Sequence, residues 1–599
     1  MSAMESVQSL EPVRSVHAPN GTDAESAVRA RSRRIAVGMA ALAAATFVAV
    51  LAYQFAFVNP KYFEYAMSLR WPRLAAMLTA AFAISAASLV FQTIIRNTIV
   101  TPCLLGMNSL YVLVHTGVFF FLGAGSAFAT DPQLAFFLDL VVMGVVATVV
   151  YNTIFEKTGG NVLYVLLIGT VLSTFFSSVQ SSITRIMDPN EYDALLTSLV
   201  ASFTNVNASV LVPGVFLLAA IGIWLRRDLA ILDVIALGRD PAVSLGVDYE
   251  RTVRRLMTGV ALSIAVATAL VGPLSFLGLI TANLSRRIFR RVGLCGDVHP
   301  HGRAVPRRAR RELQRPRERF RDDRRRHLLP LPHSYDDPYP LNVDRNFDMI
   351  TIRNLEKRYD ERAVVDDVSV TLPAGKVISM IGPNGAGKST VLGMIARLVA
   401  RSAGDIEFKG RDVSSWESRD LARHLAILTQ SYAVTMKLTV RELVAFGRFP
   451  HSGTHLTAED WEKVDEAIRY MELDPFAERF IDEMSGGQRQ RAFIAMVLAQ
   501  DTEYVLLDEP TNNLDIYHAT QMMKLVRRLC DELGKTVILV LHEINLAAFH
   551  SDYICAFKDG RVAAFGTVDE VMTSETLETI YGVPFEIHRI EGRPLAIFH

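Results

Sequence analysis

Long apolar runs, separated by short polar or basic breaks, occupy most of the first 290 residues of the chain. About 20 consecutive apolar residues are enough to cross the hydrocarbon core of a bilayer as a helix. Eight runs in series, with few charged residues among them, therefore predict an all-α polytopic membrane domain of about eight spans. The predicted spans are residues 35–58, 74–95, 99–122, 134–155, 162–183, 210–225 and 256–271, with a last, broken segment at 274–284.

Charged residues at the ends of these runs indicate the orientation of the domain. Arg29, Arg31, Arg33 and Arg34 precede the first run, and basic residues also follow the second, fourth, sixth and eighth runs. Because basic residues accumulate on the cytoplasmic side of a membrane, the amino terminus is predicted to be cytoplasmic. Residues 1–34 have no apolar period and are predicted to form a disordered cytoplasmic tail.

From residue 350 onward the pattern changes to short apolar runs that alternate with charged, amphipathic stretches. The runs at 377–381 and 504–507 are typical of buried strands, whereas residues 390–399 are typical of a helix. A strand is also expected at 350–355, where apolar and polar residues alternate. The sequence predicts a soluble α/β domain over residues 350–599.

A glycine-rich sequence joins the predicted strand 377–381 to the predicted helix 390–399. It matches the phosphate-binding pattern G-x-x-x-x-G-K-[ST]. Glycines let backbone N–H groups approach an anion, and the start of a helix favours negative charge at the same point. Lys388 is expected to contact the β and γ phosphates, and Ser389 to offer a hydroxyl to Mg²⁺. The predicted nucleoside triphosphate site comprises Gly382, Pro383, Asn384, Gly385, Ala386, Gly387, Lys388, Ser389 and Thr390.

Two carboxylates follow the predicted strand 504–507. Asp508 is expected to hold Mg²⁺, directly or through water, and Glu509 to polarise the attacking water as general base. Two other predicted strands are each followed by a polar residue that suits a nucleotide site. Gln430 is a candidate for sensing Mg²⁺ and water, and His542 is a candidate for contacting the γ-phosphate.

A second glycine-containing helix start is formed by Ser485, Gly486, Gly487 and Gln488. Such a start is an anion-binding concavity, and one domain does not need two cradles for the γ-phosphate. We therefore expect a head-to-tail dimer in which this loop of one subunit closes over ATP held by the other. Tyr359, which precedes the phosphate loop by about 23 residues, is well placed to stack on an adenine ring.

The region between the two halves departs from both patterns. Residues 291–326 contain thirteen arginines, five acidic residues and no lysine, which suits neither a membrane span nor a packed domain. Three interpretations of the irregular segment 291–349 remain open: a plain disordered linker, a basic segment that contacts nucleic acid or lipid, and a frameshift that has replaced further spans.

The zero net charge of the 599-residue chain averages two different halves, and its four distant cysteines form neither a disulfide framework nor a metal-ligand spacing.

The order of motifs in the carboxyl-terminal domain resembles that of the ABC transporter ATPases. The matching motifs are Tyr359, the loop 382–390, Gln430, the sequence 485–488, Asp508 with Glu509, Asp515 and His542. The resemblance implies that Tyr359 stacks on adenine, that Gln430 couples to the permease and that Asp515 contacts the partner subunit. Residues 499–502 and 512–518 are most similar to the ATPases of ferric-siderophore importers, although Met484 stands where leucine is usual.

The amino-terminal half resembles the bacterial permeases that import iron chelates and vitamin B12. The matching pieces are Arg70-x-Pro-Arg73, Gln92 with Arg96, Asn97 and Pro102, Leu237-Gly238, residues 245–247 and residues 272–278. The resemblance implies a permease domain over residues 35–290, in a family that usually has about ten spans. It also implies that the cytoplasmic loop 228–255 carries helices that press on the ATPase.

Together the two resemblances imply ATP-driven import of a ferric siderophore across the bacterial inner membrane, with ATP and Mg²⁺ as cofactors and the ATPase domain in the cytoplasm. They also imply an extracytoplasmic siderophore-binding protein and a second permease, either another subunit or another copy of this chain. Import of heme, cobalamin or another metal chelate is the nearest alternative. An ABC exporter is disfavoured by the number of spans and by the break at Gly272-Pro273, and a soluble-type ABC ATPase acting on nucleic acid is disfavoured by the eight apolar runs.

Overall fold

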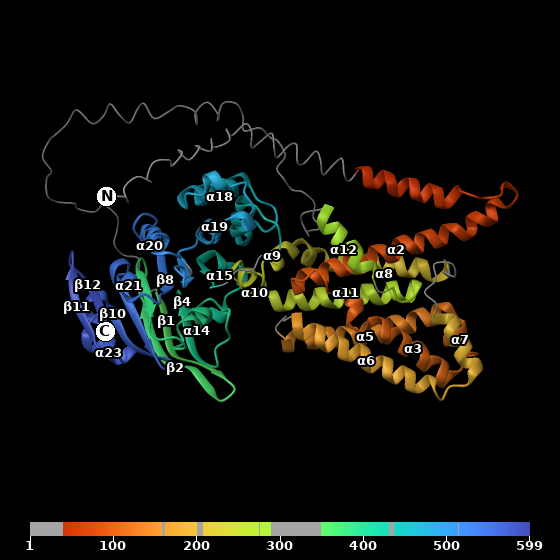
Figure 1. Cartoon of the computed structure of the whole chain (residues 1–599), viewed down its shortest axis with the longest axis horizontal. Helices are drawn as coiled ribbons and strands as arrows, with labels where there is room; N and C mark the ends of the chain where they lie inside the picture. Colours follow the sequence, from red (N-terminus) through yellow and green to blue (C-terminus); the bar gives the residue numbers. More distant parts are fainter. Residues whose placement is uncertain are drawn as a thin grey trace, which may run out of the picture. The chain divides into compact units, whose positions relative to one another are not determined.

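The computed structural model describes residues 40–158, 162–199, 208–274, 276–288, 349–430, 436–512 and 514–598 (Figure 1). The described chain forms two compact units. The first combines the helices of the amino-terminal half with Glu417–Leu529 and Ile538–Leu541. The second contains the rest of the carboxyl-terminal domain up to Trp416, together with Cys530–Val537 and His542–His599. The predicted tail 1–34 and residues 291–348 of the irregular segment lie outside the described residues.

Eight apolar helices correspond to the eight apolar runs, and the predicted fold class of the amino-terminal half is confirmed. Five of the described helices are long and apolar enough to cross a membrane by length and composition. The eight are Ala40–Phe55, α2 (Phe63–Ile95), α3 (Met107–Leu122), α5 (Pro132–Thr158), α6 (Val162–Thr184), α8 (Ala208–Ala230), α11 (Tyr249–Val271) and α12 (Leu277–Ile288).

The helix bounds differ from the predicted spans at several places, among them the starts of α2, α3 and α11 (Tyr249 against the predicted 256). The helix α2 begins eleven residues before the predicted position 74 and continues through Pro72. The helix α3 begins at Met107 rather than at residue 99, because Pro102 opens a short 3₁₀ turn (η2, Pro102–Leu105) that ends at Gly106 in a left-handed conformation. Hydrophobicity marked the apolar stretch in both cases but not where the helical hydrogen bonding starts.

Four short helices lie between the apolar ones: α4 (Ala127–Thr130) and α7 (Pro189–Leu199), which were not predicted, and α9 (Leu232–Ala236) and α10 (Arg239–Ser244). The last two occupy the loop 228–255, where the resemblance implied helices. Gly238 separates them with a φ of +114°, a backbone conformation that suits glycine. The two short helices lead directly into α11, whose first turn is capped by the Asp248 side chain accepting from the N–H of Arg251.

Close packing among the apolar helices depends on small residues and on a few polar contacts. The helix α11 packs against α2, α5 and α8. A Cβ atom on Gly259 of α11 would lie 2.1 Å from Leu225 Cδ1 of α8, so this glycine permits the close approach. Arg70 donates from one Nη1 to the carbonyls of Tyr53, Gln54 and Ala56, and so caps the end of helix Ala40–Phe55.

The carboxyl-terminal domain contains the predicted α/β fold. One sheet has the antiparallel order β2-β1-β4-β5, and a larger one has the order β10-β9-β3-β8-β7-β6, in which β3 with β9 and β6 with β7 are parallel pairs. The strands are β1 (Ile350–Tyr359), β2 (Arg362–Leu372), β3 (Val377–Ile381), β4 (Ala403–Phe408), β5 (Arg411–Asp412), β6 (Leu425–Leu428), β7 (Tyr504–Asp508), β8 (Thr536–Val540), β9 (Tyr553–Lys558) and β10 (Arg561–Thr567), followed by the hairpin β11 (Phe585–Ile590) and β12 (Arg593–Phe598).

The helix predicted at 390–399 is present, but with different bounds. The helix after the phosphate loop, α14, covers Lys388–Ile395 and stops short of the predicted 399, with Arg397 in a left-handed conformation just beyond it. The other helices are α15 (Ser418–His424), α16 (Val440–Ala445), α17 (Phe449–Ser452), α18 (Ala458–Tyr470), α19 (Gly486–Ala499), α20 (Ile516–Asp531), α21 (Ile544–His550), α22 (Val568–Val571) and α23 (Ser574–Tyr581).

Candidate nucleotide site and the family of the chain

The phosphate loop in the second unit has the geometry that its glycines predict. It leaves the fully buried strand β3 and enters α14, and Gly382, Gly385 and Gly387 all have positive φ angles. A Cβ on Gly382 would lie 2.2 Å from the carbonyl oxygen of Phe557, and one on Gly387 would lie 2.8 Å from that of Val364. No other residue type fits these two positions without moving neighbouring backbone, so the loop is held in a shape that only glycine allows.

Lys388 lies folded over this loop. Its Nζ donates to the carbonyl oxygens of Gly382 at 2.7 Å and Pro383 at 2.9 Å, and the residue is buried. An ammonium group is rarely buried unless its charge is paired or hydrogen-bonded. The two carbonyls hold the positive charge at the mouth of a helix start that has no acidic residue in its first turn. The loop therefore combines a fixed positive charge with the N–H groups of a helix terminus, which suits an anion such as a phosphate.

Two more predicted residues belong to the second unit. Tyr359 ends strand β1, is half-exposed, and has the Lys357 Nζ 4.8 Å from its ring centroid. An exposed aromatic face with a nearby cation suits stacking of a flat base. His542 follows β8 closely and is exposed. Both side chains are accessible to a ligand, as their predicted roles require.

The catalytic carboxylate predicted in the first unit is held by two amides. Glu509 follows strand β7 with a φ of +51°, an uncommon conformation for a side chain of this size. Gln430 Nε2 donates to Glu509 Oε2 at 2.5 Å, and Asn512 Nδ2 donates to the same oxygen at 3.0 Å. The predicted general base and the predicted sensor residue thus lie in direct contact, and two hydrogen bonds orient one carboxylate oxygen.

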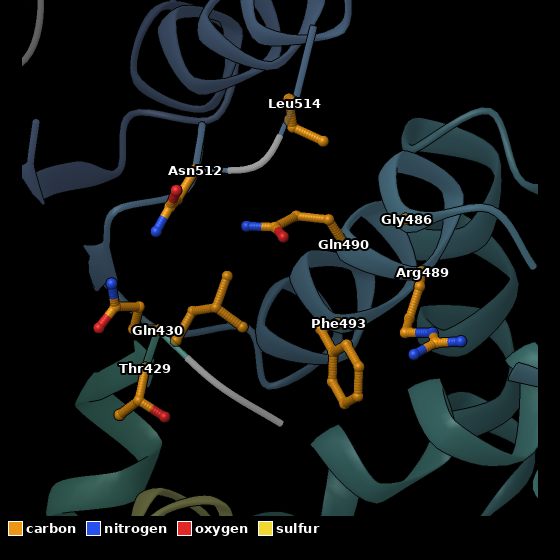
Figure 2. Close-up of a pocket in the computed structure, with 9 residues that line it drawn as sticks. Thr429, Gln430, Gly486, Arg489, Gln490, Phe493, Asn512 and Leu514 are labelled. Atoms are coloured by element: carbon orange, nitrogen blue, oxygen red, sulfur yellow. The ribbon is translucent and has the colours of Figure 1, made fainter. Parts of the chain in front are cut away.

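Asn512 was not among the predicted site residues. Its position three residues after Glu509 on the turn that follows β7 was the available signal, but the sequence does not show which way that turn folds. Asn512 also lines a pocket with Thr429, Gln430, Gly486 and Gln490 (Figure 2). The end of β6, the turn after β7 and the start of α19 therefore surround one cavity inside the first unit. Residues 431–435 and Asn513, which adjoin it, lie outside the described chain.

Ser485 acts as the N-cap of α19. Its Oγ accepts from the N–H of Gln488, and the Gln488 side chain in turn accepts from the N–H of Ser485, which completes a capping box. Gly486 has open space around it, and the first turn of α19 carries no acidic residue. The predicted anion-binding start is thus an ordered and exposed helix terminus.

Asp508 and Asp515 complete the set in the first unit. Asp508 is half-buried at the end of β7. Asp515 is exposed and accepts hydrogen bonds from the backbone N–H of His518 and from its Nδ1. The hydrogen bond from the His518 backbone is the main cause that lowers the pKa of the Asp515 carboxyl. This residue is therefore an ionised cap of α20 in the isolated chain.

Comparison with known proteins identifies both halves. The FecCD transport family matches residues 34–293, and the ABC transporter family matches residues 365–512. The petrobactin import ATP-binding protein YclP of Bacillus subtilis (strain 168) is 44% identical over 250 residues, which are 42% of this chain and 99% of that protein. The petrobactin import ATP-binding protein FatE of Bacillus anthracis is 48% identical over 250 residues, which are 42% of this chain and 100% of that protein.

A relative with lower sequence identity is named for a different ligand. The ferric enterobactin transport ATP-binding protein FepC of Escherichia coli (strain K12) is 38% identical over 243 residues, covering 40% of this chain and 90% of that protein. The nearly complete coverage of such relatives, together with the membrane match, establishes the family. The chain belongs to the ABC transporters and joins a membrane-embedded domain of the FecCD transport family to an ABC-type, nucleotide-binding ATPase domain.

Proposed function

We propose that this chain uses ATP hydrolysis to import a ferric siderophore across the bacterial inner membrane. The observation that carries the proposal is the presence, on one chain, of a FecCD-type membrane domain and an ATPase domain whose relatives are named for petrobactin, iron(3+)-hydroxamate and ferric enterobactin. In this proposal residues 35–290 form the permease domain, residues 350–599 form the ATPase domain, and the segment 291–349 joins them.

The residues of the phosphate loop bind ATP in this proposal. The loop N–H groups and Lys388 hold the phosphates, since they combine a helix terminus with a buried positive charge. Tyr359 stacks on the adenine, and His542 contacts the γ-phosphate. Ser485, Gly486, Gly487 and Gln488 of one chain close over ATP held by a partner ATPase domain, and Asp515 contacts that partner.

Hydrolysis is assigned to Glu509, which accepts a proton from the attacking water. Gln430 and Asn512 orient its carboxylate through the hydrogen bonds that they donate to Oε2. Ser389, Asp508 and Gln430 offer hydroxyl, carboxylate and amide oxygens, the ligand types that Mg²⁺ prefers. When bound, Mg²⁺ neutralises charge on the phosphates.

The expected partners are an extracytoplasmic siderophore-binding protein and a second permease, supplied by another copy of this chain or by another subunit. Import of heme, cobalamin or another metal chelate is the alternative on the same architecture. The test is uptake into proteoliposomes that contain the full chain, ATP inside, and ⁵⁵Fe loaded onto petrobactin, a hydroxamate siderophore or enterobactin. We expect ATP-dependent uptake of at least one of these and none with Lys388→Ala. Uptake of labelled cobalamin or heme in their place would overturn the siderophore assignment.

A further inference from the structure

The loop between α8 and α11 meets the ATPase helices inside the first unit. The short helix α10 packs against strand β6. The Oγ of Ser244, the last residue of α10, lies 3.3 Å from both the backbone nitrogen and the carbonyl oxygen of Ile427. Ser244 and Ile427 are both buried, so this polar contact is shielded from water.

Gln500 joins the two sides of this contact. Its side chain is almost completely buried, with a relative exposure of 1%. Its Nε2 donates to the carbonyl oxygen of Ser244 at 3.0 Å and to the carbonyl oxygen of Ala422 in α15 at 2.6 Å. Both hydrogens of one amide are thus used, one toward the membrane half and one toward the ATPase half.

A glycine brings the backbones together beside Gln500. A Cβ on Gly246 would lie 2.7 Å from Arg419 Cα, 3.0 Å from the carbonyl oxygen of Ser418 and 3.1 Å from Ala422 Cβ. The membrane loop therefore lies directly on the backbone of α15 without an intervening side chain. We name Ser244, Gly246, Ala422, Ile427 and Gln500 the α10 contact.

The helix α19 connects the α10 contact to the Ser485 loop. It begins after Ser485 and ends at Ala499, immediately before Gln500, and its 14 residues span about 21 Å. A helix of this length without proline or an internal break transmits displacement along its axis as a rigid element. The residue that caps its start is a predicted nucleotide contact, and the residue after its end holds the membrane loop.

The carboxyl end of α19 is also held by residues of the ATPase half. Arg448 donates from Nη1 to the carbonyl oxygen of Ala499 at 2.9 Å and from Nε to Asp460 Oδ1 at 2.8 Å. His451 Nε2 lies 2.9 Å from the carbonyl oxygen of Gln500. Arg448 and Asp460 are buried, so the end of the helix is held by charge-assisted hydrogen bonds that water does not weaken.

We propose that Gln500 is a positioning residue that couples movement of the Ser485 loop to the membrane domain, through α19 and the carbonyl of Ser244. The inference rests on the proposed function and adds a second connection to the one that the family resemblance implied for Gln430. Gln500 takes no part in binding or hydrolysing ATP. Its loss therefore uncouples transport from hydrolysis instead of stopping both.

The first experiment measures iron taken up per ATP hydrolysed by the full chain in proteoliposomes. Gln500→Met keeps a side chain of similar length but leaves the Ser244 and Ala422 carbonyls without their donor. We expect the ratio to fall about tenfold, the effect of losing roughly one buried hydrogen bond, while the rate of ATP hydrolysis is retained. The matched control is Thr502→Val, two residues after Gln500. This substitution removes a buried hydrogen bond to the Tyr504 carbonyl and leaves the Ser244 contacts unchanged.

An unchanged ratio in Gln500→Met, or an equal loss in Thr502→Val, would overturn the proposal. If Gln500→Met also loses ATP hydrolysis, Ser244→Ala decides from the membrane side of the contact. That substitution removes only the hydroxyl that meets Ile427. A lower ratio in Ser244→Ala supports the coupling role, and a wild-type ratio overturns it.

A second measurement separates failure of this inference from failure of the proposed function. A fluorophore is placed on Asp240→Cys in α10, where the side chain is half-exposed, in a full chain that carries Glu509→Gln and Cys295→Ser. Cys103, Cys530 and Cys555 are buried and do not compete for the label. ATP is expected to change the fluorescence when Gln500 is present but not in the Gln500→Met variant. A change of equal size in both overturns the inference, and this result does not depend on any siderophore being transported.

Discussion

The phosphate loop and the α10 contact are assembled from the chain in different ways. The phosphate loop consists of nine consecutive residues, and the hydrogen bonds from Lys388 to the carbonyls of Gly382 and Pro383 join residues six and five positions apart. In the α10 contact, Ser244 bonds to a residue 183 positions away and to another 256 positions away. One site is a local backbone conformation, whereas the other exists only when two separate halves of the chain have folded.

This difference has a functional consequence. A loop that forms from its own sequence can be placed in many folds and still bind phosphate, because backbone N–H groups and one lysine supply the chemistry. The α10 contact joins two distant segments and contains none of the predicted nucleotide-site residues. Changes in the first should stop ATP use and transport together, and changes in the second should separate them.

Lys388→Ala, in the phosphate loop, should have the largest effect of these changes. The variant removes the positive charge that the structure shows folded over the phosphate loop. A charge-assisted hydrogen bond contributes about 1.5–3 kcal/mol, so the affinity for ATP should fall at least about tenfold to a hundredfold and coupled uptake should disappear. Titration of the full chain with a fluorescent ATP analogue measures this, with Lys409→Ala outside the loop as the control. Uptake that survives would place the energy source elsewhere.

Glu509→Gln should retain ATP binding and lose hydrolysis. A positioned general base contributes about 10²–10⁴-fold to a rate, and the amide cannot accept the proton of the attacking water. The hydrogen bonds from Gln430 and Asn512 can still be made to the remaining amide oxygen, so the site should stay folded. Phosphate release by the full chain is the measurement, with the exposed Glu586→Gln as the control. Near-normal turnover would rule out the assigned role.

Asp460→Asn should weaken the support of α19 and leave the phosphate loop intact. Breaking a buried ion pair by removing one partner costs about 3–5 kcal/mol, and Asp460 and Arg448 are both buried. We expect a lower free energy of unfolding in denaturant titrations of the full chain. Glu459→Gln, an exposed acidic residue of the same helix, is the control. An unchanged stability would mean that the end of α19 does not depend on this pair.

The same carboxyl predicts how stability depends on pH. Burial acts to raise the pKa of Asp460, but hydrogen bonds from Ser452, Thr457 and Arg448 outweigh it and hold the pKa well below its usual value. The folded state therefore binds this proton less readily than the unfolded state, whose pKa is about 3.9. The contribution to stability is complete above that value and is lost as the pH falls toward the lowered pKa. Asp460→Asn should lack this part of the acid-induced loss.

Gly246→Ala, in the α10 contact, should have the smallest effect of these changes. The new Cβ would meet the backbone of α15, and Gly246 has a φ of +82°. Iron taken up per ATP should fall a few-fold, on the order of a 1 kcal/mol loss, while ATP hydrolysis continues. Gly375→Ala is the matched control, because Gly375 also has a positive φ but has open space around it. Equal behaviour of the two variants would attribute the effect to backbone strain alone.

Much of the ATPase domain could be predicted because the sequence patterns that mark its elements lie within short contiguous segments. The strand β3 was predicted at its observed bounds, and the start of α19 was predicted at Ser485, since a buried apolar run and a capping residue act on neighbouring backbone. Asn512 was missed because its role depends on how a turn places it against Glu509. The assigned roles of the site residues remain predictions.

The apolar helices and the phosphate-loop pattern can be recognised from the sequence alone, because hydrophobicity and backbone conformation are properties of consecutive residues. Tertiary structure decided which segments meet. The helices α6 and α11 each contain an 18-residue stretch of equal mean hydropathy, yet only 6% of this stretch is buried in α6 and 67% in α11. Transfer into lipid depends on the composition of one helix, whereas burial depends on the small residues and shapes of its neighbours. For the same reason Gln500 and Ser244 became partners only in the folded chain.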